Sequence, residues 1–412
     1  MVKKLEYIER TLERKFLRMN DFFKVILVTG ARQVGKTTML KHLASGQSRT
    51  YVSMDDFMAR ELAQSDPVLF FQRYQPPIII DEIQKAPQLF EQIKIMCDNT
   101  EKTGLFWLTG SQQYSMMKNI RETLAGRIGI LQLYSLSKNE MGEVKFPDNM
   151  DFSMATLLER QKMVAKNNIN DIFEYIWKGG MPYAINADAE QRHEYFESYI
   201  ATYLMRDVSE EGGITNTVQF RKFLNACAAL VAEQVNYKTL ADAAEISQPT
   251  AKIWLQLLQG LGIVYLLQPF ANNALKRLAK TPKLYFYDTG LCAYLSMWLT
   301  KDTLMNGAAS GHYFENYVVV ELLKNFGYSA NQVNFSYYRD GSSKEIDLFI
   351  EQGNVIHPLE IKKSANPDRR EIKKYEVIDK TVLERGYGGI VCMCEDVMPI
   401  DEKNCFIPCN LI

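Results

Sequence analysis

The sequence has neither a long apolar run nor a strong excess of one charge. No segment of the 412-residue chain approaches the roughly 18 apolar residues of a membrane-spanning helix. The first residues have charge but no apolar core of signal-peptide length. The net charge is −1, so a surface for nucleic acid has to be a local patch. We expect a cytoplasmic protein of about two to four domains with no membrane partner.

The cysteines do not suggest a disulfide framework. There are seven, an odd number at scattered positions. Four of them, Cys392, Cys394, Cys405 and Cys409, are close in sequence and could form a zinc site. The alternative is that residues 389–394 form a buried strand in which thiols pack as small apolar groups. We favour the buried strand.

Residues 30–37, with the sequence GARQVGKT, match the phosphate-binding pattern G-x-x-x-x-G-K-[ST] at every position. An apolar run at residues 23–28 predicts a strand before the loop, and helix formers follow at 38–43. The glycines let the backbone wrap around a polyphosphate, and the helix N-terminus offers positive partial charge. The expected ATP contacts are Gly30, Ala31, Arg32, Gln33, Val34, Gly35, Lys36, Thr37 and Thr38. Within this set, Lys36 reaches the β- and γ-phosphates and the Thr37 hydroxyl binds Mg²⁺.

A second motif, PIIIDE at residues 77–82, is an apolar strand that ends in two carboxylates. We expect Asp81 to hold Mg²⁺ through its water shell and Glu82 to polarise the attacking water. A strand followed by two solvated acids is the alternative. A nucleotide switch does not need Glu82, so this pair favours a hydrolase.

Polar residues and arginines after the next strand could complete the site. The strand at residues 104–111 predicts Thr109 or Ser111 as a sensor of the γ-phosphate, or merely a strand-ending turn. Arg127 or Arg121 could neutralise transition-state charge, in its own subunit or in a neighbour of a homo-oligomer. Surface arginines without such a role are the alternative.

The order of these motifs predicts an α/β fold with a parallel sheet between helices. Residues 1–135 form the expected ATPase core, with a further strand near residues 51–56. Helical periodicity at residues 136–215 includes Tyr195, Tyr199 and Tyr203 and is interrupted by Gly179-Gly180-Met181-Pro182. We expect this segment to be a helical lid on the nucleotide domain.

Residues 216–300 resemble a winged helix-turn-helix. Thr239 and Asp242 have the spacing of a capping box at the start of a short helix. A turn at residues 246–250 leads to a second helix at 251–259, and residues 261–267 suit a wing strand. In DNA-binding proteins this second helix lies in the major groove, but here it has one basic residue, Lys252. DNA binding and a packing role both remain open, and a basic patch could come from Lys276, Arg277, Lys280 and Lys283.

In residues 301–412, two strands flank a Gly353-Asn354 turn. That turn would pair Asp347 with Glu360 and Glu345 with Lys362. Asp347, Glu360 and Lys362 would then share one face, with Ile346 and Ile361 on the other.

Like charges placed opposite each other need compensation. A divalent cation would supply it, with Asp347 and Glu360 as ligands, Glu315 from a preceding helix as a third, and Lys362 orienting a water. This pattern resembles the restriction-endonuclease-like nuclease fold. An inactive domain of that fold, and a plain hairpin whose acids pair with Lys344, Lys362 and Lys363, are the alternatives.

Together, the motifs resemble a prokaryotic family of AAA+ ATPases in which a P-loop domain precedes a winged helix and a C-terminal domain with nuclease-like motifs. The resemblance rests on residues 30–37, Asp81-Glu82, Leu108–Ser111, Gly179–Pro182, and Asp347 with Glu360-Ile361-Lys362. It implies ATP binding with Mg²⁺ and ATP hydrolysis, with Lys36 and Glu82 as catalytic residues.

We therefore expect an Mg²⁺-dependent ATPase that controls a DNA-directed C-terminal nuclease-like module. The alternatives are an ATP switch, in which the winged helix binds DNA or a protein, and a protein-remodelling ATPase.

Overall fold

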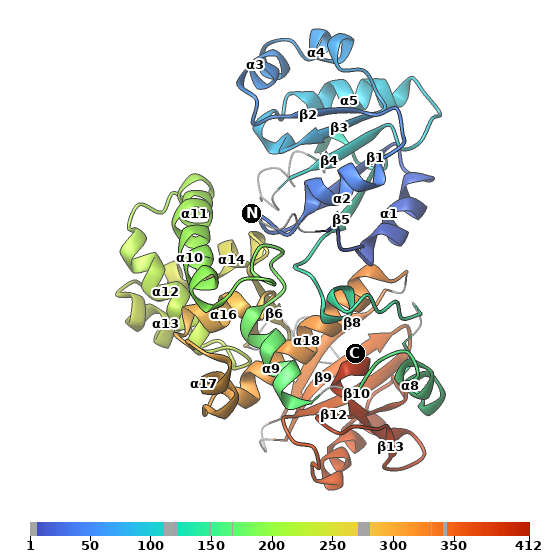
Figure 1. Ribbon diagram of the computed structural model, residues 1–412, viewed down its shortest axis with the longest axis vertical. Helices are drawn as coiled ribbons and strands as arrows, with labels where there is room; N and C mark the ends of the chain where they lie inside the picture. The colour runs from blue at the N-terminus through green and yellow to red at the C-terminus, as the bar shows by residue number, and fades with distance from the viewer. Residues whose placement is uncertain are drawn as a thin grey trace.

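The computed structural model describes residues 6–110, 120, 122–147, 150–166, 168–270, 281–330, 332–340 and 344–412, without the side chains of Glu211 and Lys380. Figure 1 shows a sheet with flanking helices at the top, a group of helices at the left and a second sheet at the bottom. Among the described residues, no helix has the length and apolar character that a bilayer crossing requires.

The first sheet is parallel and has five strands in the order β2-β3-β4-β1-β5. Its strands are β1 (Val25–Thr29), β2 (Thr50–Ser53), β3 (Ile78–Asp81), β4 (Phe106–Thr109) and β5 (Ile128–Gln132). The first four confirm the predicted strands, whereas β5 was not predicted. The sheet agrees with the expected α/β fold.

Helices cover both faces of this sheet because its strands are apolar on both sides. They are α1 (Leu12–Asn20), α2 (Lys36–Leu43), α3 (Phe57–Ser65), α4 (Pro67–Arg73), the short 3₁₀ turn η1 (Ile83–Lys85) and α5 (Leu89–Asp98). Ile26 and Trp107 pack with Phe16 of α1 and Leu40 of α2 in one core. Their sequence neighbours on the other face pack with α3, α4 and α5 in a second core.

The segment after the sheet is helical, as predicted. It contains α7 (Lys138–Met141), α8 (Met154–Gln161), α9 (Ile169–Lys178), α10 (Ala189–Tyr199), a π-helical turn η2 (Ile200–Leu204) and α11 (Met205–Gly212). The predicted interruption is confirmed, because α9 ends at Lys178 and Gly179 is its C-cap. Gly179 has φ +75°, and a Cβ there would lie 2.4 Å from Asp288 Oδ1.

These helices pack chiefly on the helical region that follows them, and less on the nucleotide domain. Helix α9 packs against α16 (Thr289–Leu295) and α17 (Lys301–Asn306), and α11 packs against α14 (Gln248–Gly260). Asp207 of α11 contacts the phosphate-binding loop by accepting a hydrogen bond from Arg32. This segment is therefore built chiefly into the helical region that follows it.

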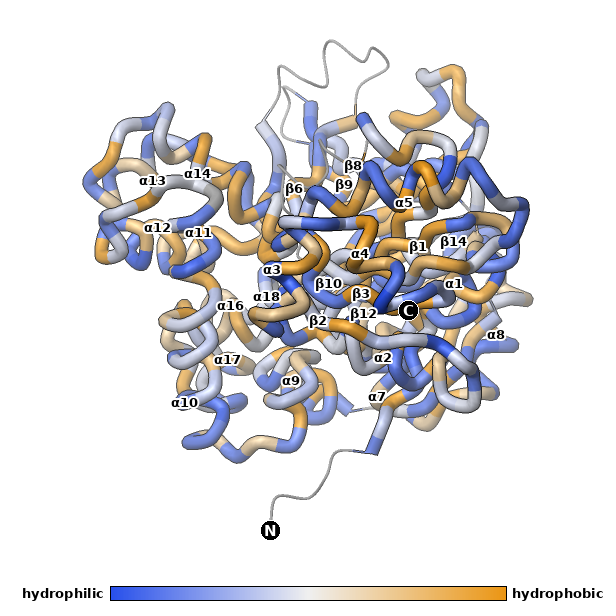
Figure 2. The backbone as a smooth tube through the Cα atoms, turned by 90° about the horizontal axis from the view of Figure 1, so that it is seen from above, coloured by the Kyte–Doolittle hydropathy of each residue, from blue (hydrophilic) through white to orange (hydrophobic). Residues whose placement is uncertain are grey.

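That helical region contains α12 (Thr217–Ala229), α13 (Tyr237–Ala244) and α14, followed by the antiparallel ribbon of β6 (Val264–Leu267) and β7 (Lys283–Phe286). Figure 2 shows α11–α14 as a lobe that projects to one side of the sheets. The predicted cap of α14 is confirmed, since the Ser247 side chain accepts a hydrogen bond from Thr250 N. The predicted capping box at Thr239 is wrong. Asn236 caps α13 instead, because its side chain accepts from Lys238 N and Thr239 N.

The C-terminal region places one long helix, α18 (Ser310–Tyr328), against a mixed sheet of seven strands. The main path has the order β13-β14-β12-β10-β9-β8, and β11 pairs with β10. The elements are β8 (Asn334–Arg339), β9 (Glu345–Gln352), β10 (Val355–Lys362), the 3₁₀ segment η3 (Arg369–Lys380), β11 (Glu384–Arg385), β12 (Gly388–Cys392), β13 (Met398–Pro399), β14 (Asn404–Pro408) and the 3₁₀ turn η4 (Cys409–Leu411).

The predicted hairpin register is confirmed from the turn as far as Leu348 and Leu359, and the predicted pairs Asp347–Glu360 and Glu345–Lys362 lie beyond these paired positions. Val355 pairs with Gln352 and Leu359 with Leu348, so Gly353-Asn354 forms the turn. The predicted sharing of a face by Ile346 and Ile361 is wrong, because they pack in different hydrophobic clusters. The cause is an irregularity in the pairing of β8 with β9, where the register shifts between Ser336 and Tyr338.

The strand predicted around Cys392 is confirmed as β12. Cys392, Cys394, Cys405 and Cys409 are all buried and free. Across the described ranges, no group of three or more His, Cys, Asp or Glu side chains is arranged to hold a metal ion.

Candidate functional site

The phosphate-binding loop connects the end of β1 to the start of α2. Gly30 has φ +142°, and a Cβ there would lie 2.1 Å from Leu133 O, so no other residue fits without moving the backbone. Gly35, with φ +99°, precedes the first residue of α2. The Lys36–Leu43 helix therefore begins with its unpaired N–H groups at the loop, as an anion site requires.

Lys36 is buried at the first position of α2. Its Nζ donates to Gly30 O at 3.0 Å and to Ala31 O at 2.9 Å. Burial lowers the pKa of Lys36 to about 8, although the charge of Glu82 opposes this shift. The ammonium thus lies inside the loop and is held by two carbonyl groups.

Asp81 is buried at the end of β3 and gathers three hydroxyl groups. Thr37 Oγ1 and Thr109 Oγ1 each donate to Asp81 Oδ1 at 2.5 Å, and Tyr51 OH donates to Oδ2 at 3.2 Å. A carboxylate beside a threonine hydroxyl at the loop is an oxygen donor set that suits Mg²⁺. The residues present therefore fit the ion that the loop motif implies.

Glu82 follows Asp81 in a left-handed conformation, with φ +56°. Its backbone N donates to Thr109 Oγ1 at 3.1 Å, and Gln84 Nε2 donates to its carboxylate. Thr109 is thereby bonded to both residues of the acidic pair. This arrangement brings the predicted Thr109 next to Asp81 and Glu82 at the carboxyl edge of the sheet.

The remaining predicted loop residues differ in their surroundings. Thr38 is exposed in the first turn of α2, Val34 is buried, and Gln33 has φ +62°. Ser111 and Arg121 lie outside the described residues.

Arg127 lies at the opposite end of the sheet from the loop. Its carbonyl accepts from Val25 N at the start of β1, whereas the loop follows the end of that strand. Its guanidinium pairs with Asp98, with Nε 2.6 Å from Oδ1. The expectation that Arg127 reaches a phosphate in its own subunit is therefore not met by this arrangement, because the length of β1 separates them.

Arg32 of the loop forms a bidentate ion pair that the sequence analysis missed. Its Nε lies 2.7 Å from Asp207 Oδ2, and its Nη2 donates to Oδ1 at 2.8 Å. Both side chains are largely buried. The two residues are 175 positions apart, so nothing in the local sequence of either one indicates the pair.

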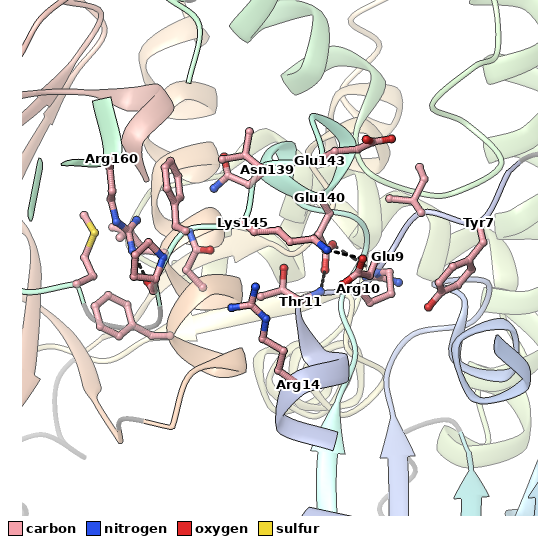
Figure 3. A pocket seen from close by; sticks show the side chains of 18 residues that line it. Tyr7, Glu9, Arg10, Thr11, Arg14, Asn139, Glu140, Glu143, Lys145 and Arg160 are labelled. Carbon is pink, nitrogen blue, oxygen red and sulfur yellow. Dashed lines mark hydrogen bonds and ion pairs between the residues drawn. The ribbon is translucent and has the colours of Figure 1, made fainter. Parts of the chain in front are cut away.

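Arg10 also binds the loop, from the N-terminal segment. Its Nη1 donates to Val34 O at 2.8 Å and its Nη2 to Tyr134 O at 2.7 Å, while its Nε lies 3.3 Å from Glu140 Oε2. Figure 3 shows Glu140 directed toward Arg10 in the wall of a cavity of about 310 Å³, with Arg160 at the far side. The lining of this cavity includes Arg10 and Glu140 but none of residues 30–37 of the phosphate-binding loop.

The predicted carboxylates Asp347 and Glu360 come together on the neighbouring strands β9 and β10. Asp347 Oδ2 accepts from Ile361 N at 2.8 Å, and Lys362 Nζ lies 3.5 Å from Asp347 Oδ2 and 3.1 Å from Glu360 Oε1. Burial and then the charge of Asp347 raise the pKa of Glu315, on α18, to about 7. Burial and then the Asp347 charge likewise raise the pKa of Glu360 to about 8.

Two further lysines enter this cluster, and neither was predicted to belong to it. Lys374 Nζ donates to Glu360 Oε1 at 3.2 Å. Lys283 Nζ lies 3.0 Å from Glu315 Oε1 and 2.6 Å from Glu345 Oε1, so Glu345 pairs with Lys283 and not with Lys362. The prediction that Lys283 belongs to an exposed basic patch is wrong, since it is buried in this cluster.

The carboxylates of this cluster do not fit a divalent cation in the arrangement seen. Its lysines already bind one carboxylate oxygen of Glu315 and one of Glu360. Among the described residues, no three or more His, Cys, Asp or Glu side chains are placed together so that they could hold a metal ion. The cluster is a network of ion pairs in this structure.

The exposed face of α14 carries little positive charge. Gln248, Lys252, Ile253 and Gln256 are exposed, whereas Trp254 and Leu255 face the core. Lys276, Arg277 and Lys280 lie outside the described residues. The surface of this helix therefore offers one cation, Lys252.

A parallel sheet with a phosphate-binding loop after β1 and an acidic pair after β3 defines a P-loop ATPase domain. The family model described as "AAA domain" matches residues 22–142. The models described as "Domain of unknown function (DUF8612)" and "Domain of unknown function (DUF4143)" match residues 169–302 and 310–412. The chain thus carries an ATPase domain of the AAA type followed by two domains of unassigned function.

Similar proteins are known from bacteria and archaea. Uncharacterized protein Rv2008c of Mycobacterium tuberculosis is 25% identical over 94% of this chain and 80% of its own length. Uncharacterized protein MJ1637 of Methanocaldococcus jannaschii is 22% identical over 75% of this chain and 70% of its own. Among solved structures, the Walker-type ATPase PABY2304 of Pyrococcus abyssi covers 71% of this chain and 96% of its own, with 14% identity and a TM-score of 0.43.

Proposed function

We propose that this chain is an Mg²⁺-dependent ATPase whose nucleotide cycle controls a DNA-directed, nuclease-like C-terminal module. The observation that carries the ATPase part is the convergence of Thr37, Thr109 and Asp81 beside the buried Lys36. These residues supply the cation, the hydroxyl and the carboxylate that a polyphosphate with Mg²⁺ requires.

Each residue has a distinct part in this proposal. Lys36 leaves the carbonyls of Gly30 and Ala31 and binds the β- and γ-phosphate oxygens. Thr37 and Asp81 would hold Mg²⁺, which neutralises phosphate charge when it is bound. Glu82 accepts a hydrogen bond from the attacking water and orients it toward the γ-phosphate.

Thr109 senses the γ-phosphate in this proposal. Its hydroxyl group donates to Asp81 and accepts from Glu82 N. A movement of Thr109 on loss of the γ-phosphate would therefore alter its hydrogen bonds to both Asp81 and Glu82. Arg127 contributes only across a subunit interface, if the protein forms a homo-oligomer.

The proposed role of the C-terminal module rests on Asp347 and Glu360, whose carboxylates both lie within 3.5 Å of the Lys362 ammonium. Incubation of the purified protein with plasmid DNA, ATP and Mg²⁺ or Mn²⁺ tests it. Cleavage that is lost in Glu360→Ala and Lys362→Ala supports the nuclease. Intact DNA under all of these conditions contradicts it.

A second candidate is a non-nucleolytic ATP switch in which the α12–α14 region binds DNA or a protein. The carboxylate cluster favours it, since lysines pair with Glu315 and with Glu360. ATPase rates measured with and without single- and double-stranded DNA separate the candidates from a protein-remodelling ATPase. Stimulation by DNA supports a DNA-directed role, and stimulation only by an unfolded polypeptide contradicts it.

A further inference from the structure

We propose that Lys283 is a built-in cation that occupies the C-terminal carboxylate cluster and keeps a divalent ion out of it. The inference rests on the proposed role of Asp347 and Glu360 in the C-terminal module. It goes beyond that role, because it assigns control of the cluster to a residue from outside the module.

Lys283 comes from β7, in the ribbon that precedes the C-terminal domain. Its side chain is 5% exposed and its Nζ bridges Glu315 Oε1 at 3.0 Å and Glu345 Oε1 at 2.6 Å. Burial opposes a charged lysine, but the charges of Glu315, Asp347 and Glu345 raise its pKa above the ordinary value. Lys283 therefore remains an ammonium among these carboxylates.

The position of this ammonium conflicts with a divalent ion in the same cluster. Such an ion needs carboxylate oxygens at about 2.0 to 2.6 Å, and Lys283 already takes one from Glu315. A second cation a few ångströms away would also be repelled. A divalent ion can therefore take the Glu315 oxygen only when Lys283 leaves it.

The cluster retains one carboxylate oxygen with unmet bonding capacity. Lys362 and Lys374 both bind Glu360 Oε1, whereas Glu360 Oε2 is buried without a hydrogen-bond partner among the described residues. A buried carboxylate oxygen without a partner is costly. A cation ligated by this oxygen would remove that cost, so the present arrangement leaves one part of a metal site unsatisfied.

The ribbon that carries Lys283 extends to the nucleotide loop. At one end of the ribbon Lys283 pairs with Leu267, and at the other Val264 pairs with Phe286. Gly262, just before β6, lies against the loop, since a Cβ there would be 3.4 Å from Ala31 N. A shift of the loop backbone on nucleotide binding therefore acts on the element that places Lys283.

Binding of Mn²⁺ to the nucleotide-free full-length protein, followed by electron paramagnetic resonance of the free ion, tests the inference. Lys283→Met should bind one Mn²⁺ at least about tenfold more tightly than the wild type. The gain should disappear in the Lys283→Met/Asp347→Asn double variant. Lys283→Gln, whose amide can still donate to Glu315, serves as a second variant if the methionine variant unfolds.

Lys324→Met is the matched control, because Lys324 is equally buried and ion-paired, to Glu321 at 2.9 Å. It should leave Mn²⁺ affinity unchanged, which would show that loosening of the fold is not the cause. Equal Mn²⁺ affinity in wild type and both Lys283 variants, lost in Asp347→Asn, overturns the inference and leaves the metal role of the module intact. No Asp347-dependent binding in any variant overturns both.

Discussion

Arg32 in the phosphate-binding loop and Asp207 in α11 form a bidentate, largely buried ion pair, with Nε 2.7 Å from Oδ2. The pair joins the nucleotide site to the helical region that contains α14, because α11 packs on α14. A loop that must rearrange around phosphates is therefore tied to the helices proposed to bind DNA or protein. A movement of the loop on nucleotide binding would therefore act on α11, and through α11 on α14.

The Arg32–Asp207 pair should contribute measurably to stability. A double-variant cycle of Arg32→Met and Asp207→Asn, followed by urea unfolding, should give a coupling free energy of about 1 to 3 kcal/mol. The exposed pair Arg206–Glu210 in the same helix, with N–O distance 2.8 Å, is the control. It should give only about 0.3 to 0.5 kcal/mol. Equal coupling in the two pairs would show that burial adds nothing to the Arg32 pair.

ATP affinity should fall as the pH rises through the pKa of Lys36. Burial lowers that pKa to about 8. Bound phosphates favour the ammonium, so above pH 8 binding must take up a proton. Affinity for a non-hydrolysable ATP analogue should therefore drop about tenfold from pH 7 to pH 9. Lys36→Arg should remove this dependence because the guanidinium remains charged. A wild-type affinity that is constant over this range would contradict the buried, titrating Lys36.

Arg127→Ala should leave ATP turnover in a single subunit within about twofold of the wild type, since surface substitutions away from a site have small effects. The reason is the position of Arg127 beside Asp98, at the far end of β1 from the loop. Turnover measured over a dilution series checks this. A loss of turnover that is independent of protein concentration would contradict the position. A loss confined to high concentration would instead indicate action across a subunit interface.

If α14 binds duplex DNA, Lys252→Ala should weaken binding for all sequences. The salt dependence of log K should then become shallower by about one unit, as expected for one lost phosphate contact. Lys102→Ala, a change at an exposed residue of the ATPase domain, is the control. An unchanged salt slope in Lys252→Ala would remove α14 from the DNA-binding surface.

Much of the ATPase domain could be predicted from the sequence, because its motifs are local. Residues 30–37 and 77–82 specify a loop and a strand end within a few positions, and the parallel sheet follows from their order. The β9–β10 register was also predictable, since the Gly353-Asn354 turn fixes the pairing.

The relationships that could not be predicted join distant parts of the chain. Asp207 pairs with Arg32, and Lys283 pairs with Glu315, because separate regions of the chain pack together. The local sequence around these residues does not indicate that packing. The Asn236 cap was missed because Thr239, three residues later, is also a residue type favoured at the N-cap. The bulge between Ser336 and Tyr338 depends on the neighbouring strand, so alternation within β9 alone could not reveal it.

ATP binding and turnover by Glu82→Gln test the central claim most directly. Lys36→Ala serves as the binding-deficient reference, and Glu91→Gln, a change at an exposed acid of α5, is the control for charge. We predict that Glu82→Gln binds ATP as the wild type does and loses at least about a hundredfold in turnover, the usual contribution of a positioned general base. Lys36→Ala should lose ATP binding, and Glu91→Gln should retain both. Unchanged turnover in Glu82→Gln would contradict the assignment of the acidic pair as the hydrolytic centre.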